Sequence, residues 1–132
     1  MEIFIDSSAF ISGFIKTDSN HKRATECYKK FSDSVKFSTT DLVYFECMTV
    51  ISQKAGLIAA KSFSAYFKSL HIKTYTIKSK EILLAEQLMF SARSKNIAFF
   101  DCLYVAIMEI NKIDKIFTYD GHFKKLGVAM IG

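Results

Sequence analysis

The chain contains no proline among its 132 residues, so it lacks the residue that most firmly ends a helix or strand. Breaks between elements therefore have to be read from glycine, serine, aspartate and asparagine. Every apolar stretch is interrupted well before the length of about 18 residues that a membrane-spanning helix needs. No signal-peptide pattern precedes the first strand-like segment. The sequence thus predicts a protein that does not enter a membrane.

Cysteine is also scarce, and its three copies form no C-x-x-C pair. Cys27, Cys47 and Cys102 have apolar neighbours, which is typical of reduced thiols in a protein core. Reduced thiols fit a cytoplasmic protein, because disulfides persist in oxidising compartments. The absence of a thiolate or imidazole cluster in the sequence argues against a zinc site.

Only two of the 18 basic residues are arginine, yet the net charge is +5. A modest positive field attracts a polyanion such as RNA or DNA. A lysine-rich surface also keeps a protein soluble, so charge alone does not choose between these roles. Half of the residues are hydrophobic, and the length fits one domain, which we expect to span residues 1–132.

Strand-like and helix-like segments alternate along the chain. We expect strands over residues 2–6, 36–38, 72–77, 115–119 and 128–131. We expect a first helix over about 9–16. A second helix follows the cap signal at 18–20 and ends at about 31, and a third follows the cap signal at 39–41 and ends at about 54. Further helices are expected over about 58–70, 79–94 and 100–110, with a short turn or helix at 121–126. The candidate helix caps are Ser7, Ser8, Asn20, Thr39, Thr40, Asp41 and Ser79.

This alternation indicates an α/β fold. Strands joined through helices imply right-handed crossovers and a mainly parallel sheet that is covered on both faces. The continuous apolar run over residues 3–5 agrees with burial on both faces. We therefore expect a three-layer α/β/α architecture around a central sheet of about four to five strands. Ligands of such sheets bind at the carboxyl ends of the strands.

Four acids stand in apolar surroundings, where an ionised carboxylate without a partner costs several kcal/mol. Asp6 and Asp120 close strand-like runs, so both are expected at the carboxyl ends of strands. Glu46 and Asp101 lie in apolar helical segments, and Asp101 falls in a first turn, where the helix dipole favours negative charge. This pattern predicts that the four acids meet in the fold.

Carboxylates that meet in this way require a cation. One pair at about 4 Å repels by roughly 4 kcal/mol at an effective dielectric constant of about 20. Mg²⁺ or Mn²⁺ relieves that repulsion, and a carboxylate-held ion with open water positions performs phosphate chemistry. Ser7, Ser8 and Thr118 stand beside the strand-end acids and are candidates to hydrogen-bond them. Helix capping by the serines and the strand preference of threonine are the alternative explanations.

The order and spacing of these motifs resemble those of PIN domains. The resemblance rests on Asp6-Ser7-Ser8, on Glu46, on the segment from Phe100 to Ala106 and on the segment from Phe117 to Phe123. The length and single-domain build are most similar to the VapC-type toxin ribonucleases of toxin–antitoxin pairs. Ser7 stands where many relatives carry threonine, and the position of Asp120 varies between Asp and Asn in the family.

The resemblance implies an Mg²⁺- or Mn²⁺-dependent endoribonuclease that cleaves single-stranded or structured RNA. The matching catalytic and metal-binding acids are Asp6, Glu46, Asp101 and Asp120. The family also implies a homodimer and an antitoxin whose tail enters the acidic site. A non-catalytic RNA- or protein-binding module on a PIN-like fold is the competing hypothesis.

Other charged residues receive weaker assignments. Lys124 and Lys125 follow Asp120 closely and are the candidates for phosphate contacts, with a solvated surface as the alternative. The histidines are interpreted as surface or packing residues, although His122 is only two positions past Asp120. A haloacid-type phosphatase is excluded because the first strand is not followed by Asp-x-Asp. A phospho-receiver is excluded because the third expected strand does not end in aspartate.

Overall fold

A five-stranded sheet forms the centre of the molecule, and every neighbouring pair of its strands is parallel. The computed structural model describes residues 1–92 and 96–132. The strands follow the spatial order β3-β2-β1-β4-β5. Their bounds are Glu2–Ile5 for β1, Lys36–Thr40 for β2, Lys73–Tyr75 for β3, Lys115–Phe117 for β4 and Ala129–Ile131 for β5. The prediction of a mainly parallel sheet of about four to five strands is confirmed.

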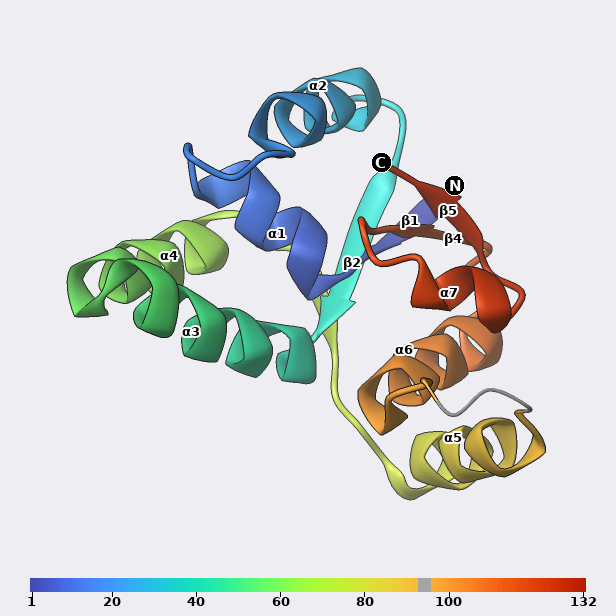
Figure 1. The fold of residues 1–132 in the computed structure, drawn as a ribbon. Coiled ribbons are helices and arrows are strands. Elements are labelled where there is room, and N and C mark those ends of the chain that lie inside the picture. The colour runs from blue at the N-terminus through green and yellow to red at the C-terminus, as the bar shows by residue number, and fades with distance from the viewer. Residues whose placement is uncertain (93–95) are drawn as a thin grey trace.

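Helices cover both faces of this sheet, as Figure 1 shows. The first group comprises α1 (Ser7–Phe14), α2 (His21–Phe31), α3 (Asp41–Ala55) and α4 (Leu57–Ser69). The second group comprises α5 (Ser79–Ser91), α6 (Phe99–Ile110) and α7 (His122–Lys125) on the opposite side. Right-handed crossovers explain the division, because the chain runs from β1 to β3 in one direction and then returns to β4 and β5. The expected three-layer α/β/α architecture is confirmed.

The strand order reverses between the neighbouring strands β1 and β4. The connection from β1 leads to β2 on one side, whereas the connection from β4 leads to β5 on the other. In open parallel sheets, a crevice outside the carboxyl ends of the strands opens at this reversal and forms the usual ligand site. Asp6 directly follows β1 and Thr118 directly follows β4, so both residues border the crevice.

The apolar central strands explain why the sheet is buried on both faces. Ile3, Phe4 and Ile5 of β1 have no solvent exposure, and neither have Ile116 and Phe117 of β4. Full burial of such side chains stabilises the fold by about 1.5–3 kcal/mol for each one relative to an exposed position. In the part of the chain that the structure describes, no helix combines the length and apolar character that a membrane crossing requires.

Helix α6 is fixed to the central strand by aromatic packing. The Tyr104 ring lies 5.8 Å from the Phe4 ring, measured between centroids. The first turn of α6, which carries Asp101, is thereby held beside the sheet. This contact links the burial of α6 to the position of one candidate site residue.

Several predicted helix caps are wrong. Ser7 begins α1, and neither Ser7 nor Ser8 makes a capping hydrogen bond, because both hydroxyls contact carboxylates instead. Thr39 belongs to β2, where its hydroxyl donates to the carbonyl of Ile5 in β1. Thr40 does occupy the N-cap position of α3, but its hydroxyl donates to the carbonyl of Tyr75 in β3 and makes no capping hydrogen bond. A short polar side chain near a helix start therefore has long-range partners in this fold that sequence proximity does not reveal.

The helix α5 also differs from expectation at both ends. Ser79 is its first residue rather than its cap, and the Glu81 carboxylate accepts the backbone N–H of Lys78 at 3.1 Å. The helix ends at Ser91, and the predicted end at Ser94 lies outside the described residues. The expected strand over 72–77 pairs only over Lys73–Tyr75, which form a short strand at the edge of the sheet.

Candidate active site

All four acids identified in the sequence line one cavity of about 310 Å³ at the carboxyl edge of the sheet. Asp6 lies at the junction of β1 and α1, and Glu46 projects from the middle of α3. Asp101 lies in the first turn of α6, and Asp120 follows β4. The predicted convergence of these residues is thus present in the fold.

Asp6 is the most deeply buried of the four acids, with 3% of its surface exposed. Its Oδ2 atom accepts hydrogen bonds from Ser8 Oγ at 3.0 Å and from Thr118 Oγ1 at 2.8 Å. Burial raises the pKa of Asp6, while the hydrogen bonds from Thr118 and Ser8 act in the opposite direction. The ionised form of Asp6 is therefore costly unless a cation lies nearby.

The same two hydroxyls tie the site to the backbone after β4. Thr118 Oγ1 accepts the N–H of Asp120 at 2.9 Å, and Ser8 Oγ accepts the N–H of Tyr119 at 2.9 Å. Each hydroxyl has one proton, which it donates to Asp6, and uses a lone pair for the backbone. Ser8 and Thr118 thus orient one acid and at the same time hold the segment that carries another.

Glu46 is held by two hydroxyl groups. Ser7 Oγ donates to Glu46 Oε1 and lies 3.4 Å from Asp6 Oδ1, so it bridges two acids. The Tyr104 hydroxyl donates to Glu46 Oε2 at 3.4 Å. Burial and the charge of Glu46 raise the pKa of Tyr104, which keeps its hydroxyl protonated as a donor. This contact joins residues 58 positions apart, so it could not be read from the sequence.

Asp101, Asp120 and His122 form a compact group, in which one ligand atom from each lies within 4.8 Å of the others. His122 Nδ1 is 3.2 Å from Asp120 Oδ1 and 4.0 Å from Asp101 Oδ2. The sequence interpretation treated His122 as a surface or packing residue, with its closeness to Asp120 as the one signal. The structure places its partly exposed imidazole beside two of the acids that line the cavity.

The electrostatics of Asp101 show how strongly negative charge is crowded here. Burial, followed by the charges of Asp120 and Asp6, raises the pKa of Asp101 to about 6, although His122 acts to lower it. Two buried acids with raised pKa values in one cavity form an environment that a hard cation stabilises. The oxygen donors of the four acids fit Mg²⁺ or Mn²⁺, which prefer carboxylate and water ligands.

The cavity also contains residues that sequence reasoning did not assign to it. Asp18 and Asn20, which belong to the expected cap signal at 18–20, line the wall, and Lys54 contributes a cation from the end of α3. Lys124 lines a neighbouring cavity, whereas Lys125 is exposed on α7. Only the three-dimensional approach of α2, α3 and the segment after β4 brings these side chains together.

The family model of the PIN domain matches residues 3–129. The chain belongs to the PIN-domain family. The resemblance observed in the sequence is therefore confirmed over nearly the whole chain. A search of curated protein sequences finds no significant match.

Two solved structures share the fold of this PIN domain. VapC20 of Mycobacterium tuberculosis, described as a toxin that cleaves the sarcin–ricin loop, has a TM-score of 0.87 and 21% identity over 96% of each chain. VapBC2 of Rickettsia felis, solved with a DNA fragment from its promoter, has a TM-score of 0.74 and 14% identity. That match covers 99% of this chain and 98% of the other. At these identities, the similarity establishes the common fold.

Proposed function

We propose that this PIN domain is an Mg²⁺- or Mn²⁺-dependent endoribonuclease and the toxin of a toxin–antitoxin pair. The observation that carries the proposal is the convergence of Asp6, Glu46, Asp101 and Asp120 in one cavity at the point where the strand order reverses. The description of VapC20, a chain of the same fold, as an RNA-cleaving toxin supports the same class of reaction.

The residues of the cavity have distinct roles in this proposal. When bound, Mg²⁺ or Mn²⁺ supplies Lewis acidity at a scissile phosphate and activates water for attack. Asp6, Glu46, Asp101 and Asp120 would supply the oxygen ligands that hold the ion. Ser7, Ser8 and Thr118 are positioning residues, because their hydroxyls fix the carboxylate oxygens before the ion arrives.

RNA fits the charge of the surroundings. The chain carries a net charge of +5, and Lys54 lines the acidic cavity itself. A lysine at the mouth of a metal site attracts the phosphate that the acids alone would repel. Lys124 and Lys125 remain proposed phosphate contacts on α7.

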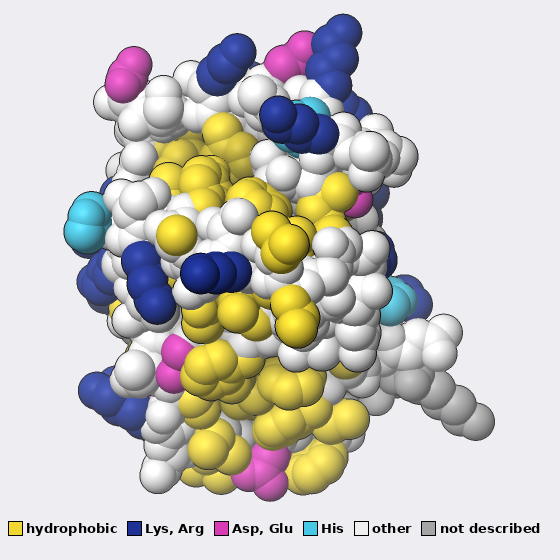
Figure 2. Space-filling view, turned by 90° about the vertical axis from the view of Figure 1, so that its left-hand side faces the viewer, with side chains coloured by type: hydrophobic (Ala, Val, Ile, Leu, Met, Phe, Trp, Pro, Cys, Tyr) yellow, Lys and Arg dark blue, Asp and Glu magenta, His cyan; other side chains and the backbone are white. Residues whose placement is uncertain are grey.

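An apolar groove of about 280 Å³ adjoins the acidic cavity at Glu46. Phe45 and Phe100 border it and are 57% and 51% exposed. Figure 2 shows that hydrophobic side chains gather on the face that carries α3 and α4. We propose that the antitoxin covers this groove with apolar residues and extends a basic tail into the acidic cavity, where the charges are complementary.

A homodimer and a cytoplasmic location complete the proposal. Leu57 and Ile58 at the start of α4 are 81% and 86% exposed. Exposed apolar surface of this kind is typical of protein contacts. Light scattering of the purified chain tests the dimer, with Leu57→Lys expected to shift the population towards monomer.

The function is tested by incubating a mixed RNA pool with the purified chain, with and without EDTA. We expect cleavage only with Mg²⁺ or Mn²⁺, and a loss of about 100-fold or more in Asp6→Asn. Asp114→Asn is the matched control, because Asp114 is exposed and lies outside the cavity. RNA binding that survives EDTA, without cleavage in any divalent ion, would favour the non-catalytic binding module instead.

A further inference from the structure

A second cavity, of about 420 Å³, adjoins the acidic one. Asn20 and Tyr119 line both cavities. Its other walls come from α2, from β5 and from the segment between β4 and α7. Arg23 and Lys124 line this cavity, and none of the described residues in its wall is acidic. The charged side chains described in the wall of the second cavity are therefore basic, whereas those of the first are mostly acidic.

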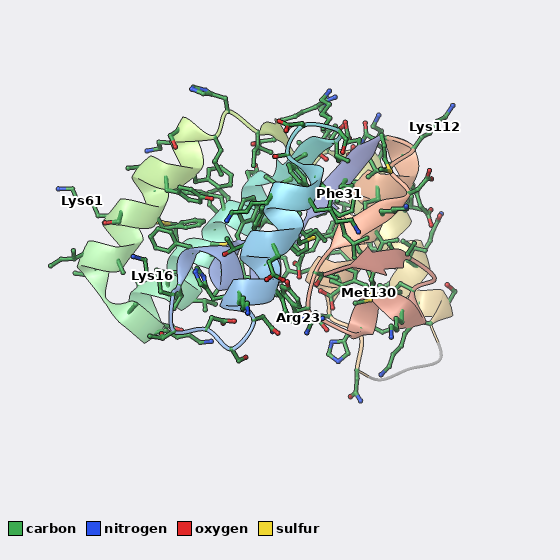
Figure 3. The ribbon with its side chains drawn as sticks, turned by 90° about the horizontal axis from the view of Figure 1, so that it is seen from above. Lys16, Arg23, Phe31, Lys61, Lys112 and Met130 are labelled. Carbon is green, nitrogen blue, oxygen red and sulfur yellow. The ribbon has the colours of Figure 1, made fainter. Side chains whose placement is uncertain are left out.

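Arg23 is held in place within this wall. Its Nη2 atom donates to the backbone carbonyl of Gly132 at 3.0 Å, and its Nη1 atom donates to Asn20 Oδ1 at 3.4 Å. Its guanidinium carbon lies 5.3 Å from the centre of the Tyr119 ring. Figure 3 shows Arg23 at the junction between α2 and the half of the sheet that carries Met130. An arginine has five N–H donors, so donors remain for an anion after these two hydrogen bonds.

The residues shared by the two cavities are themselves fixed. The N–H of Asn20 donates to Asp18 Oδ1 at 2.8 Å, and the N–H of Tyr119 donates to Ser8 Oγ at 2.9 Å. Ser8 in turn donates to Asp6. The wall that supports Arg23 is therefore connected, through one serine hydroxyl, to the acid at the centre of the neighbouring cavity.

We propose that Arg23 and Lys124 form a phosphate subsite for the RNA strand whose scissile phosphate lies at the four acids. The inference rests on the proposed ribonuclease function and adds the path of the substrate, which passes over Asn20 and Tyr119 towards α2 and α7. The planar guanidinium of Arg23 suits bidentate contact with a phosphate, and Lys124 adds a point charge. Such contacts position the strand without reading its bases.

Binding of a short fluorescent single-stranded RNA tests this subsite. The chain is used in full, with Asp101→Asn in every protein so that the RNA stays intact in Mg²⁺. Arg23→Gln and Lys124→Gln are compared with Lys22→Gln and Lys29→Gln, which remove the same charge from exposed positions on α2 outside both cavities. Arg23→Gln is expected to bind about tenfold more weakly, by an equal factor for RNAs of different sequence.

The salt dependence separates a phosphate contact from a loss of structure. For each contact removed, the slope of log affinity against log salt should become shallower by about 0.7 for a single strand. Arg23→Lys keeps the charge but loses the planar fork, so its slope should stay near the parent value while its affinity falls. The melting temperature of each variant is measured alongside, and steady-state cleavage without Asp101→Asn should show a raised KM at an unchanged kcat.

The outcomes distinguish the two proposals. If Arg23→Gln and Lys22→Gln have equal affinities and slopes while the unmodified chain cleaves RNA, the subsite is wrong and the ribonuclease stands. If the unmodified chain neither binds nor cleaves RNA with any divalent ion, the proposed function and the subsite both fall. A shallower salt dependence in Arg23→Gln and Lys124→Gln, with no change in Lys22→Gln and Lys29→Gln, supports the subsite.

Discussion

Thr118 donates its hydroxyl proton to Asp6 Oδ2 across 2.8 Å, although 112 positions separate the two residues in the chain. The same hydroxyl oxygen accepts the N–H of Asp120 at 2.9 Å. One buried side chain therefore sets the position of one acid and of the backbone that carries another. The threonine after β4 serves the candidate site as well as the strand.

Replacing Thr118 by valine keeps the shape of the side chain and removes its hydrogen bonds to Asp6 and to the N–H of Asp120. We expect Thr118→Val to lower the free energy of unfolding by about 1–3 kcal/mol, because Asp6 and the N–H of Asp120 both lose a partner. RNA cleavage should fall by about tenfold, as expected for a disturbed ligand support. Thr118→Ser should retain both properties, and exposed Thr76→Val is the control. Equal stability and activity in all three variants would show that the hydroxyl has no such role.

The raised pKa of Asp101 predicts how stability depends on pH without metal. Between the ordinary value of 3.8 and the folded value of about 6, the unfolded chain releases a proton that the folded chain retains. The folded form binds more protons in this range, so its stability falls as the pH rises and the loss is complete above about 6. We expect a loss of about 1–2 kcal/mol, after allowing for solvent screening.

Chemical denaturation in EDTA at several pH values across this range measures that loss. The asparagine of Asp101→Asn cannot ionise, so this variant should not show the loss of stability that we attribute to Asp101. Asp114→Asn, exposed and distant from the cavity, should follow the unmodified chain. An unchanged pH dependence in Asp101→Asn would mean that another group is responsible.

Metal binding should reverse the stability ranking of the chain and its Asp6→Asn variant. In EDTA the variant should melt higher, because it removes one of the crowded charges. At a Mg²⁺ concentration 100 times the dissociation constant, the unmodified chain should gain about 2.7 kcal/mol, or roughly 10 °C. The variant should gain little. Differential scanning calorimetry with a Mg²⁺ titration decides this, and parallel curves for the two proteins would count against a shared ion.

His122 is expected to support the metal site. Its Nδ1 atom lies 3.2 Å from Asp120 Oδ1, so it either orients that ligand or contributes its own nitrogen. His122→Gln should weaken Mn²⁺ binding by about 10- to 100-fold, measured by calorimetric titration. His71→Asn is a suitable control, since His71 is exposed and asparagine tolerates its positive φ of 49°. Identical Mn²⁺ affinity in both variants would assign His122 to the surface.

The positions of the four acids could be predicted because they depend on features that a sequence carries locally. Apolar runs before Asp6 and Asp120 mark strand ends, and alternation with helices implies that those ends lie on one edge of a parallel sheet. Glu46 and Asp101 could be added because acids are rare in apolar helical segments. The resemblance to PIN domains then assigned all four acids to one site, because their order along the chain matches the family's acidic motifs.

Other features depend on contacts between distant segments and leave no local signal. The sequence suggests hydrogen bonds from Ser7 and Ser8 to the neighbouring Asp6, with helix capping as the alternative. Only the approach of α3 and of the segment after β4 reveals Glu46 as a partner of Ser7 and the N–H of Tyr119 as a partner of Ser8. In the sequence His122 has the features of a surface histidine, and only the structure shows that α7 places it beside Asp101. The cavity of Arg23 forms where α2 meets β5, which no nearby pattern in the sequence predicts.

The central claim is that the four acids hold a divalent cation for RNA cleavage. Crystals grown with Mn²⁺ and measured for its anomalous scattering test the claim most directly. We predict an anomalous peak within coordination distance of carboxylate oxygens of Asp6, Asp101 and Asp120, and its disappearance in Asp6→Asn. An Mn²⁺-loaded crystal with this cavity empty, or with an equal peak in the variant, would contradict the account.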